Sequence, residues 1–462
     1  MLLYSSAMEF VDQFIKSELP FVSFIDVLAL RHSVEMIFRN SGKPSSLFEY
    51  IKIISCLALG ATMTEQTVWA ERLFTQCQEL CAEFMDVVNL DMVQVTFIMA
   101  QFQMQTGHPN SAYLLTGRAI RKATAAGFHR EMPLGSNIPP TFIEQRRLTF
   151  WSLCIFEYII CFSLGRPHSI SEGNIHILLP DNRFIIIMAQ LTSITCRAGQ
   201  LLYGSQQGSM KSRWAASQEI QQALRQFESS LPKCFQFEDP DTSLPGCQSV
   251  AQFFLGSAPT RRPVVYHHTM LLQFRPFLIS HTFRQNGHDL AASVTRSSDN
   301  DNQDAGSWLQ EAFANASETA RKLIRFVSTA YVSLPTTKSL RFNGFYIDAA
   351  CFVLILSMLR SVNPEAEDLL LVHHGLDCLS QMLPDKWAAL SHSVFAIKRM
   401  LALLDQKRKP EIRVSPGLEP NLSNDLEGGD GAVSWLETQA EFDRLRESTY
   451  EALRWDVTNS LF

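Results

Sequence analysis

Apolar residues recur at spacings of three and four along most of this chain. Such spacing places them on one face of a helix, which makes one turn every 3.6 residues. The strict alternation of apolar and polar residues that is typical of a half-buried strand is scarce. The pattern therefore predicts an all-α fold, an irregular array of helices with αα-hairpins. A regular solenoid is not expected, because no second copy of any unit recurs at a fixed period.

The most clearly delimited helix begins at Pro140. Thr141 and Glu144 have the spacing of a capping box, in which both side chains bind free backbone amides of the first turn. One apolar stripe follows, formed by Leu148, Trp151, Ile155, Tyr158 and Phe162. The helix is expected to end at 165–167, Gly-Arg-Pro, since glycine and proline commonly terminate helices.

Further helices are expected on both sides of this one. Upstream, 91–105 and 111–126 form an αα-hairpin around a Gly-His-Pro-Asn turn. Downstream, helical spacing covers parts of 187–231 and 262–283, and then 308–332, 346–362, 365–382 and 388–406. The chain thus divides into one helical domain over 1–410, a linker over 411–431 and an amphipathic acidic tail over 432–462. A polar segment at about 285–307 is predicted to be a disordered insertion within the domain.

Composition narrows the classes of function. The 462 residues carry 40 Lys and Arg against 46 Asp and Glu, a formal charge of -6. This sign disfavours a broad phosphate-binding surface, so DNA contact would be local or made by a partner. The longest apolar stretches, 46–63 and 351–359, are interrupted by charges or too short to cross a membrane, so no membrane association is expected. The ten cysteines are expected to be buried thiols.

No sequence motif indicates catalysis. The chain lacks a Walker loop, GxGxxG after a strand, GxSxG and HExxH. The densest aspartate cluster lies in the polar insertion, so no catalytic, cofactor-binding or metal-binding residue is predicted, and the chain is not expected to be an enzyme. For each of the two adjacent histidine pairs, 267–268 and 373–374, we expect one histidine at the core edge and one exposed, since neighbouring helical side chains diverge.

Basic residues gather in four short clusters. Three are formed by Arg118, Arg121 and Lys122, by Arg146 and Arg147, and by Arg261 and Arg262. We interpret these three as solvated or salt-bridged faces. The fourth, formed by Lys407, Arg408 and Lys409, precedes the linker and is a candidate nuclear-import signal.

Four motifs in a fixed order resemble the middle homology region of fungal zinc-cluster transcription factors. They are GFHRE at 127–131, EQRRLTFW at 144–151, LGRPHSI at 164–170 and ILLP at 177–180. With similar landmarks at 57–61 and 266–278, the resemblance covers about 40–335.

The signature residues have structural roles in this interpretation. Glu144 caps its helix, Arg147 pairs with Glu144 or Glu131, and Trp151 anchors the core. Gly165 and Pro167 end the helix, and the guanidinium of Arg166 binds free carbonyls or an acid.

The resemblance implies a nuclear, pathway-specific transcription regulator, for instance of a metabolic or biosynthetic gene cluster. Its expected partners are the transcription machinery or other regulators, a second copy or a heterodimer partner, and a small-molecule effector. The family's DNA reader holds two zinc ions with six cysteines, whereas this sequence has no CxxC and its first cysteine is Cys56. Zinc and direct DNA binding are thus expected only from a missing segment, and DNA is otherwise contacted through a partner. The alternative is an effector-binding or protein-binding module, or a corepressor, without DNA binding of its own.

Overall fold

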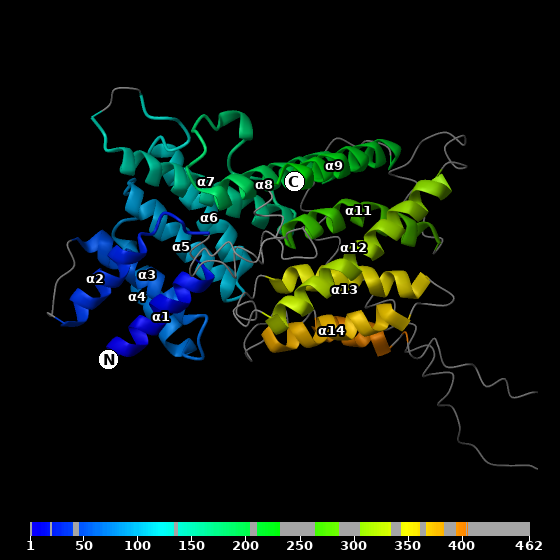
Figure 1. Cartoon of the computed structure of the whole chain (residues 1–462), viewed down its shortest axis with the longest axis horizontal. Helices are drawn as coiled ribbons and strands as arrows, with labels where there is room; N and C mark the ends of the chain where they lie inside the picture. The colour runs from blue at the N-terminus through cyan, green and yellow to red at the C-terminus, as the bar shows by residue number, and fades with distance from the viewer. Residues whose placement is uncertain are drawn as a thin grey trace, which may run out of the picture.

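The computed structural model describes residues 2–18, 21–39, 46–133, 137–203, 210–231, 264–285, 305–333, 343–360, 366–382, 394–402 and 404. Its helices are α1 (Tyr4–Ser17), α2 (Val27–Arg39), α3 (Leu47–Ala61), α4 (Thr67–Ala82), α5 (Leu90–Gln105), α6 (Pro109–Ala125), α7 (Pro140–Leu164), η1 (Glu172–Asn174), α8 (Arg183–Tyr203), α9 (Met210–Ser230), α11 (Val264–Gln285), α12 (Ala305–Ser333), α13 (Asn343–Arg360) and α14 (Ala366–Met382) (Figure 1). Within these ranges the only β-type pairing is an isolated bridge between Arg130 and His176. The predicted all-α fold is confirmed.

Local sequence signals set several helix ends. Ser46 and Asn89 cap α3 and α5, because their side-chain oxygens accept the amides of Glu49 at 3.1 Å and Met92 at 2.9 Å. Gly107, Gly127 and Gly165 follow α5, α6 and α7 with φ angles of 82°, 74° and 65°. Glycine tolerates this left-handed conformation, which turns the chain away from the helix axis. The structure thus contains the predicted hairpin, as α5 and α6.

The buried apolar residues form two cores. The first core lies among α1 to α7 and includes Phe10, Phe14 and Phe97. The second core lies among α7, α8, α9 and α11 to α14 and includes Phe274, Phe277 and Tyr346. In Figure 1 the blue and cyan helices surround the first core, and the green to orange helices surround the second.

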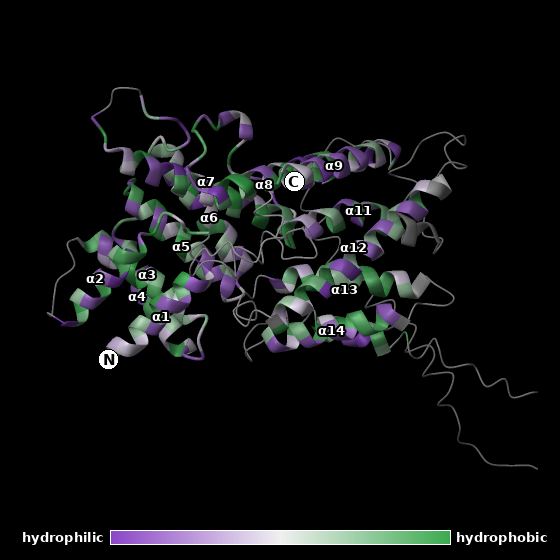
Figure 2. Ribbon diagram, in the orientation of Figure 1, coloured by the Kyte–Doolittle hydropathy of each residue, from purple (hydrophilic) through white to green (hydrophobic). Residues whose placement is uncertain are grey.

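Helix α7 connects the two cores. Its residues Phe150 and Leu153 belong to the first core, whereas Ile155 and Ile159 belong to the second. A helix that contacts protein on several sides must be apolar nearly all round. In Figure 2, hydrophilic residues are frequent on α9, at the edge of the molecule, and apolar residues are frequent on α13 and α14.

Among the helices that the structure describes, α7 and α8 reach the length and hydropathy of a membrane span. These were not the stretches that looked most apolar in the sequence. The structure buries 61% of the most apolar window of α7 and 56% of that of α8 inside the protein. Helices at the centre of a protein core are commonly long, apolar and mostly buried, as these two are.

Parts of the predicted domain organisation lie outside the described residues. The ends of the predicted insertion at 285–307 are helical, because α11 extends to Gln285 and α12 begins at Ala305. The rest of that segment, the linker at 411–431, the tail at 432–462 and the basic clusters at 261–262 and 407–409 are not among the described residues.

Candidate functional site

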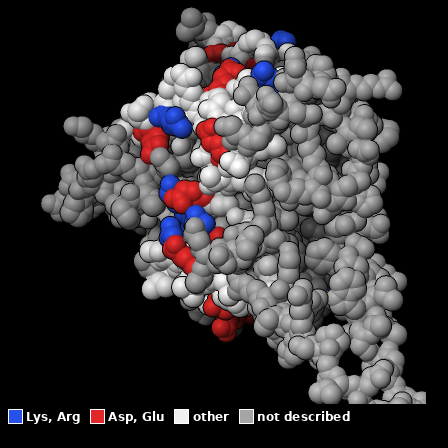
Figure 3. All heavy atoms as spheres, turned by 90° about the vertical axis from the view of Figure 1, so that its right-hand side faces the viewer, with Lys and Arg blue, Asp and Glu red and all other residues white. Residues whose placement is uncertain are grey.

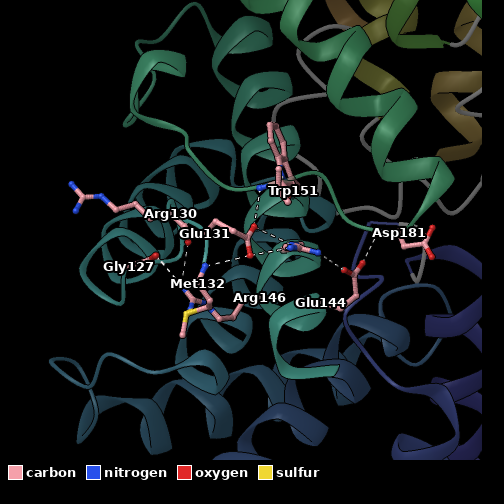
Figure 4. A network of polar contacts seen from close by, with 10 residues as sticks. Gly127, Arg130, Glu131, Met132, Glu144, Arg146, Trp151 and Asp181 are labelled. Atoms are coloured by element: carbon pink, nitrogen blue, oxygen red, sulfur yellow. Dashed lines mark hydrogen bonds and ion pairs between the residues drawn. The ribbon is translucent and has the colours of Figure 1, made fainter. Parts of the chain in front are cut away.

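Three of the predicted signature residues lie on one face of α7. Glu144, Arg147 and Trp151 are spaced by three and four residues, which brings their side chains together on a helix. They face Glu131, which follows α6, and the extended segment 178–181, which precedes α8. We call Glu131, Glu144, Arg147 and Trp151 the signature network (Figure 4).

Arg147 is the centre of the signature network. Its Nη2 lies 2.9 Å from Oε1 of Glu131, and its Nε donates to Oε2 at 3.1 Å. Its Nη1 lies 3.5 Å from Oε2 of Glu144. The predicted pairing of Arg147 with these two acids is confirmed, and its two-point contact with Glu131 uses the planar fork of the guanidinium.

The signature network also holds the segment before α8. Glu131 Oε2 accepts the amide of Leu178 at 3.1 Å, and Trp151 Nε1 donates to the carbonyl of Leu178 at 3.0 Å. Glu144 Oε1 accepts the amide of Asp181 at 2.6 Å. The side chains on α7 thus satisfy backbone groups of a segment that has no secondary structure of its own.

Charge stabilises this arrangement. Burial raises the pKa of Glu131, but the hydrogen bonds from Arg147 and from backbone amides outweigh this effect and leave the pKa below its usual value. The hydrogen bond to Glu131 in turn raises the pKa of Arg147. Both groups are therefore ionised at neutral pH.

The predicted capping box is wrong. Helix α7 begins at Pro140, directly after Pro139, and no side chain caps its first turn. Thr141 consequently lies inside the helix, where it cannot act as the cap. Glu144 is free to bind the amide of Asp181 instead. Trp151 is half-buried and packs against both cores, so it anchors their junction rather than the interior of one core.

Two cations that we expected on solvated or salt-bridged faces are buried. Lys122 is 7% exposed, and its Nζ donates to the carbonyls of Met85 and Val87, each at 2.6 Å. Arg146 is 6% exposed, donates to the carbonyl of Gly127 at 2.8 Å and lies over the ring of Phe128. Burial lowers the pKa of both groups, because it disfavours the charged form. The oxygens that bind both cations are backbone carbonyls, which any residue carries and which therefore give no signal in the sequence.

The end of α7 is built from Gly165, Arg166 and Pro167. Gly165 adopts the left-handed conformation, and the backbone amide of Arg166 donates to the carbonyl of Cys161 at 2.8 Å, as expected for a helix end. The guanidinium of Arg166 does not have its predicted partners. It binds Oδ1 of Asn110 and lies 4.8 Å from the ring centroid of Tyr113, which ties this turn to the start of α6.

A hollow of about 410 Å³ lies beside this turn, between the end of α7, α8 and α11. Its walls include the apolar or aromatic residues Phe162, Tyr203 and Leu272, with Arg166 and Arg275 among the polar ones. Apolar walls with a few charged groups are typical of sites that bind small organic molecules. We call it the α7-end hollow.

The described histidines and cysteines do not form a metal-binding cluster. Among the described residues, no group of three or more His, Cys, Asp or Glu side chains could hold a metal ion. The prediction for the histidine pairs is wrong, because His267 and His268 are both buried and His373 and His374 are both exposed. Burial lowers the pKa of His268 to about 3, so it is neutral at physiological pH. The eight described cysteines form no disulfide with one another and are buried, as expected.

Comparison with known proteins identifies the region that contains this site. A family model described as the fungal specific transcription factor domain matches residues 33–193, which include the whole signature network. "Activator of stress genes 1" of Saccharomyces cerevisiae is 30% identical over 101 residues, 21% of this chain and 10% of that protein. A transcriptional regulatory protein of Schizosaccharomyces pombe is 22% identical over 222 residues, 45% of this chain and 27% of that protein.

A third relative is an ABC-transporter-regulating transcription factor of Aspergillus fumigatus, 28% identical over 96 residues, 20% of this chain and 11% of that protein. The matches with these three relatives thus span between 10% and 27% of the relatives' lengths. The relatives are transcription regulators and not enzymes.

Proposed function

Because residues 33–193 form a fungal specific transcription factor domain, we propose that this chain is a nuclear regulator of transcription. It acts through a helical regulatory and interaction domain and controls the genes of one metabolic or biosynthetic pathway. The observation that carries the proposal is the family match, which coincides with the residues of the signature network.

The geometry of the signature network supports a scaffold role for this part of the domain. Arg147, Glu131, Glu144 and Trp151 contact one another and the backbone of the segment before α8. These four side chains do not include a nucleophile paired with a general base, the arrangement that covalent catalysis requires. The network holds α6, α7 and the approach to α8 together, and regulation would use the surface that this scaffold presents.

Charge supports the proposal that DNA contact comes from a partner or from a zinc-cluster segment. The formal charge is -6, and acidic and basic side chains are interspersed among the described residues on the face seen in Figure 3. A surface that grips the phosphate backbone needs a continuous basic stripe. In this proposal the domain supplies protein contacts to other regulators, to the transcription machinery or to a second copy of itself.

The test is a tethering experiment in a fungal host. The full chain is fused to an unrelated DNA-binding domain, and the output of a reporter with the matching sites is measured. We expect the fusion to raise or lower the output relative to the DNA-binding domain alone. Unchanged output, together with an unchanged transcriptome after deletion of the gene, would refute the proposed function.

Two finer parts of the proposal have their own readouts. If the chain serves one pathway, the transcripts that change on deletion belong to one set of functionally related genes; changes scattered across unrelated genes contradict this.

If Lys407, Arg408 and Lys409 form the import signal, replacing all three by alanine moves a fluorescent fusion out of the nucleus. Unchanged nuclear fluorescence removes the import role and leaves the regulatory one intact.

A second candidate function is an effector-binding module without DNA binding of its own. The α7-end hollow favours it, because a volume of about 410 Å³ lies in the range of small-molecule sites. Substituting Gly199, which lines this hollow, by leucine would fill it. If an effector acts there, the response of the reporter to growth conditions disappears while the basal output of the fusion remains.

A further inference from the structure

A second hollow, of about 550 Å³, shares Ile170 and Ser171 with the α7-end hollow. The last turns of α6, the residues after Gly127 and the segment 169–176 form its walls. Its lining consists of Ile120, Arg121, Thr124, Ala125, His129, Arg130, Ser169, Ile170, Ser171, Asn174 and His176. We call it the α6 hollow.

Backbone contacts fix the walls of the α6 hollow. The amide of His176 donates to the carbonyl of His129 at 2.7 Å, and the amide of Glu131 donates to the carbonyl of His176 at 3.1 Å. The amide of Ser169 donates to the buried carboxylate of Glu157 at 2.9 Å. These bonds use main-chain groups of the lining residues. The side chain of Ser169 also binds Glu157, and that of His129 binds the backbone of Thr124, so both are held in place.

The lining is basic and contains no carboxylate. Arg121 and Arg130 face it together with His129 and His176. Elsewhere in the described part of the chain arginines commonly have acidic partners, as in Arg31–Asp12, Arg147–Glu131, Arg197–Glu219, Arg321–Asp368 and Arg325–Glu367. Within that same part, neither Arg121 nor Arg130 forms an ion pair, and Arg130 points away from the signature network in Figure 4.

The lining of the hollow therefore has a net positive charge. Burial lowers the pKa of His129, and the nearby Arg130 and His176 lower it further by repulsion. Glu157 is 1% exposed, binds the amide of Ser169 and interacts electrostatically with Arg121, but it does not line the hollow. An anion bound between the two arginines would relieve the repulsion among these basic groups.

The remaining polar groups match the oxygens of a phosphoryl group. Thr124 and Ser171 contribute hydroxyls, and Asn174 contributes an amide. Guanidinium groups bind phosphate through paired N–H donors, and hydroxyls add further donors around the remaining oxygens. We infer that the α6 hollow is a binding site for a small phosphorylated molecule, held by Arg121 and Arg130.

The size and surroundings of the hollow favour a small ligand over a nucleic acid. A volume of about 550 Å³ accommodates a phosphate ester of metabolite size. A nucleic-acid backbone requires basic groups along an extended track, whereas the chain as a whole has a charge of -6. This inference does not depend on the proposed function, because ligand binding is measured on the purified chain.

The test uses the full chain, with inorganic phosphate and phenyl phosphate as probes and acetate at the same ionic strength as the reference. We expect both phosphates to bind saturably in calorimetry and to raise Tm, whereas acetate gives no saturable effect. Replacing Arg121 or Arg130 by glutamine should weaken phenyl phosphate binding by about tenfold or more, since each change removes charged hydrogen bonds.

The matched control is Arg118→Gln. Arg118 is exposed on α6, three residues before Arg121, and does not line the α6 hollow. This variant should bind phenyl phosphate like the unmodified chain, and all three variants should keep the Tm of the unmodified chain without phosphate. Binding that fails to saturate, or that Arg118→Gln weakens as much as Arg121→Gln, overturns the inference. If a short DNA duplex binds more tightly than phenyl phosphate, and this binding depends on Arg121 and Arg130, the site binds nucleic acid and the inference of a small ligand is overturned.

Discussion

The two cores of this protein are both rich in buried apolar residues but differ in what else holds them. In the first core, buried polar side chains bind the backbone of connecting segments: Lys122 holds the loop after α4, and Arg146 holds the turn after α6. Polar contacts that join one helix directly to another occur in both cores, as in Gln94–Thr149 of the first, and they are the kind that the described part of the second core shows in Arg321–Asp368 and Thr195–Thr269. Packing between helices there depends mainly on apolar faces.

This difference gives a physical reason for the position of the family match. A contact between a buried cation and backbone carbonyls requires a particular residue type at a particular place, whereas apolar packing tolerates swaps that keep volume and pattern. Specific motifs are therefore expected around the first core. The match over residues 33–193 lies mostly there, and the end of α8 and all later helices lie beyond it.

The largest expected effect comes from a glycine at a close contact in the first core. A Cβ atom added to Gly60 on α3 would lie 2.0 Å from the backbone oxygen of Phe10 on α1. Since backbone cannot swing aside, α1 and α3 must separate in a Gly60→Ala variant. We expect a loss of about 4 kcal/mol in the free energy of unfolding, measured by urea denaturation.

The matched variant in the second core is Gly375→Ala on α14. Its Cβ would lie 2.5 Å from Sγ of Cys351, which is a side-chain atom. A loss of about 1 kcal/mol is expected, because the thiol can shift and alanine favours the helix. Adding Cys351→Ala should relieve the contact and recover part of that loss. Equal losses for the two glycine variants would contradict the distinction between a backbone contact at Gly60 and a side-chain contact at Gly375.

A buried acid offers a second test of the first core. Glu18, at the end of α1, is 3% exposed and accepts a hydrogen bond from Nε2 of Gln105 at 2.8 Å. Burial raises its pKa to about 7, although the bond from Gln105 lowers it. The folded state thus holds this proton more tightly than the unfolded state, so the contribution of Glu18 to stability is largest below pH 4.5 and is lost as pH rises to about 7.

The corresponding variant is Glu18→Gln, which keeps the acceptor for Gln105 and removes the ionisation. At pH 8 it should be more stable than the unmodified chain by about 3 kcal/mol, and at pH 4 the two should be nearly equal. Urea unfolding at several pH values measures the difference. A stability difference that stays constant between pH 4 and pH 8 would show that Glu18 does not titrate in this range.

The sequence predicted the elements well and the long-range polar contacts poorly. The α5–α6 hairpin and the end of α7 were predictable, because apolar spacing and the glycines at 107, 127 and 165 are local signals. The partners of Glu144 and Arg166 were not, since Asp181 and Asn110 lie 37 and 56 residues away along the chain. The pairing of Arg147 with Glu144 was predictable because the two residues lie one helical turn apart, and Glu131 was the alternative partner; the structure has both.

The smallest expected loss of stability comes from a substitution in the signature network. It can be compared directly with a substitution of an arginine in the second core. Replacing Arg147 by methionine leaves Glu131 and Glu144 without their cation, but these side chains are 28% and 30% exposed and can regain water. We therefore expect a loss of only about 1 kcal/mol in stability. In Arg321→Met of the second core the loss should be greater, because its partner Asp368 is only 4% exposed.

The Arg147 variant should instead increase hydrogen exchange at the amides of Leu178 and Asp181, since those amides depend on carboxylates that Arg147 positions. If exchange at these two amides is unchanged, the network does not hold the segment before α8, and the contrast drawn between the two cores loses its clearest example.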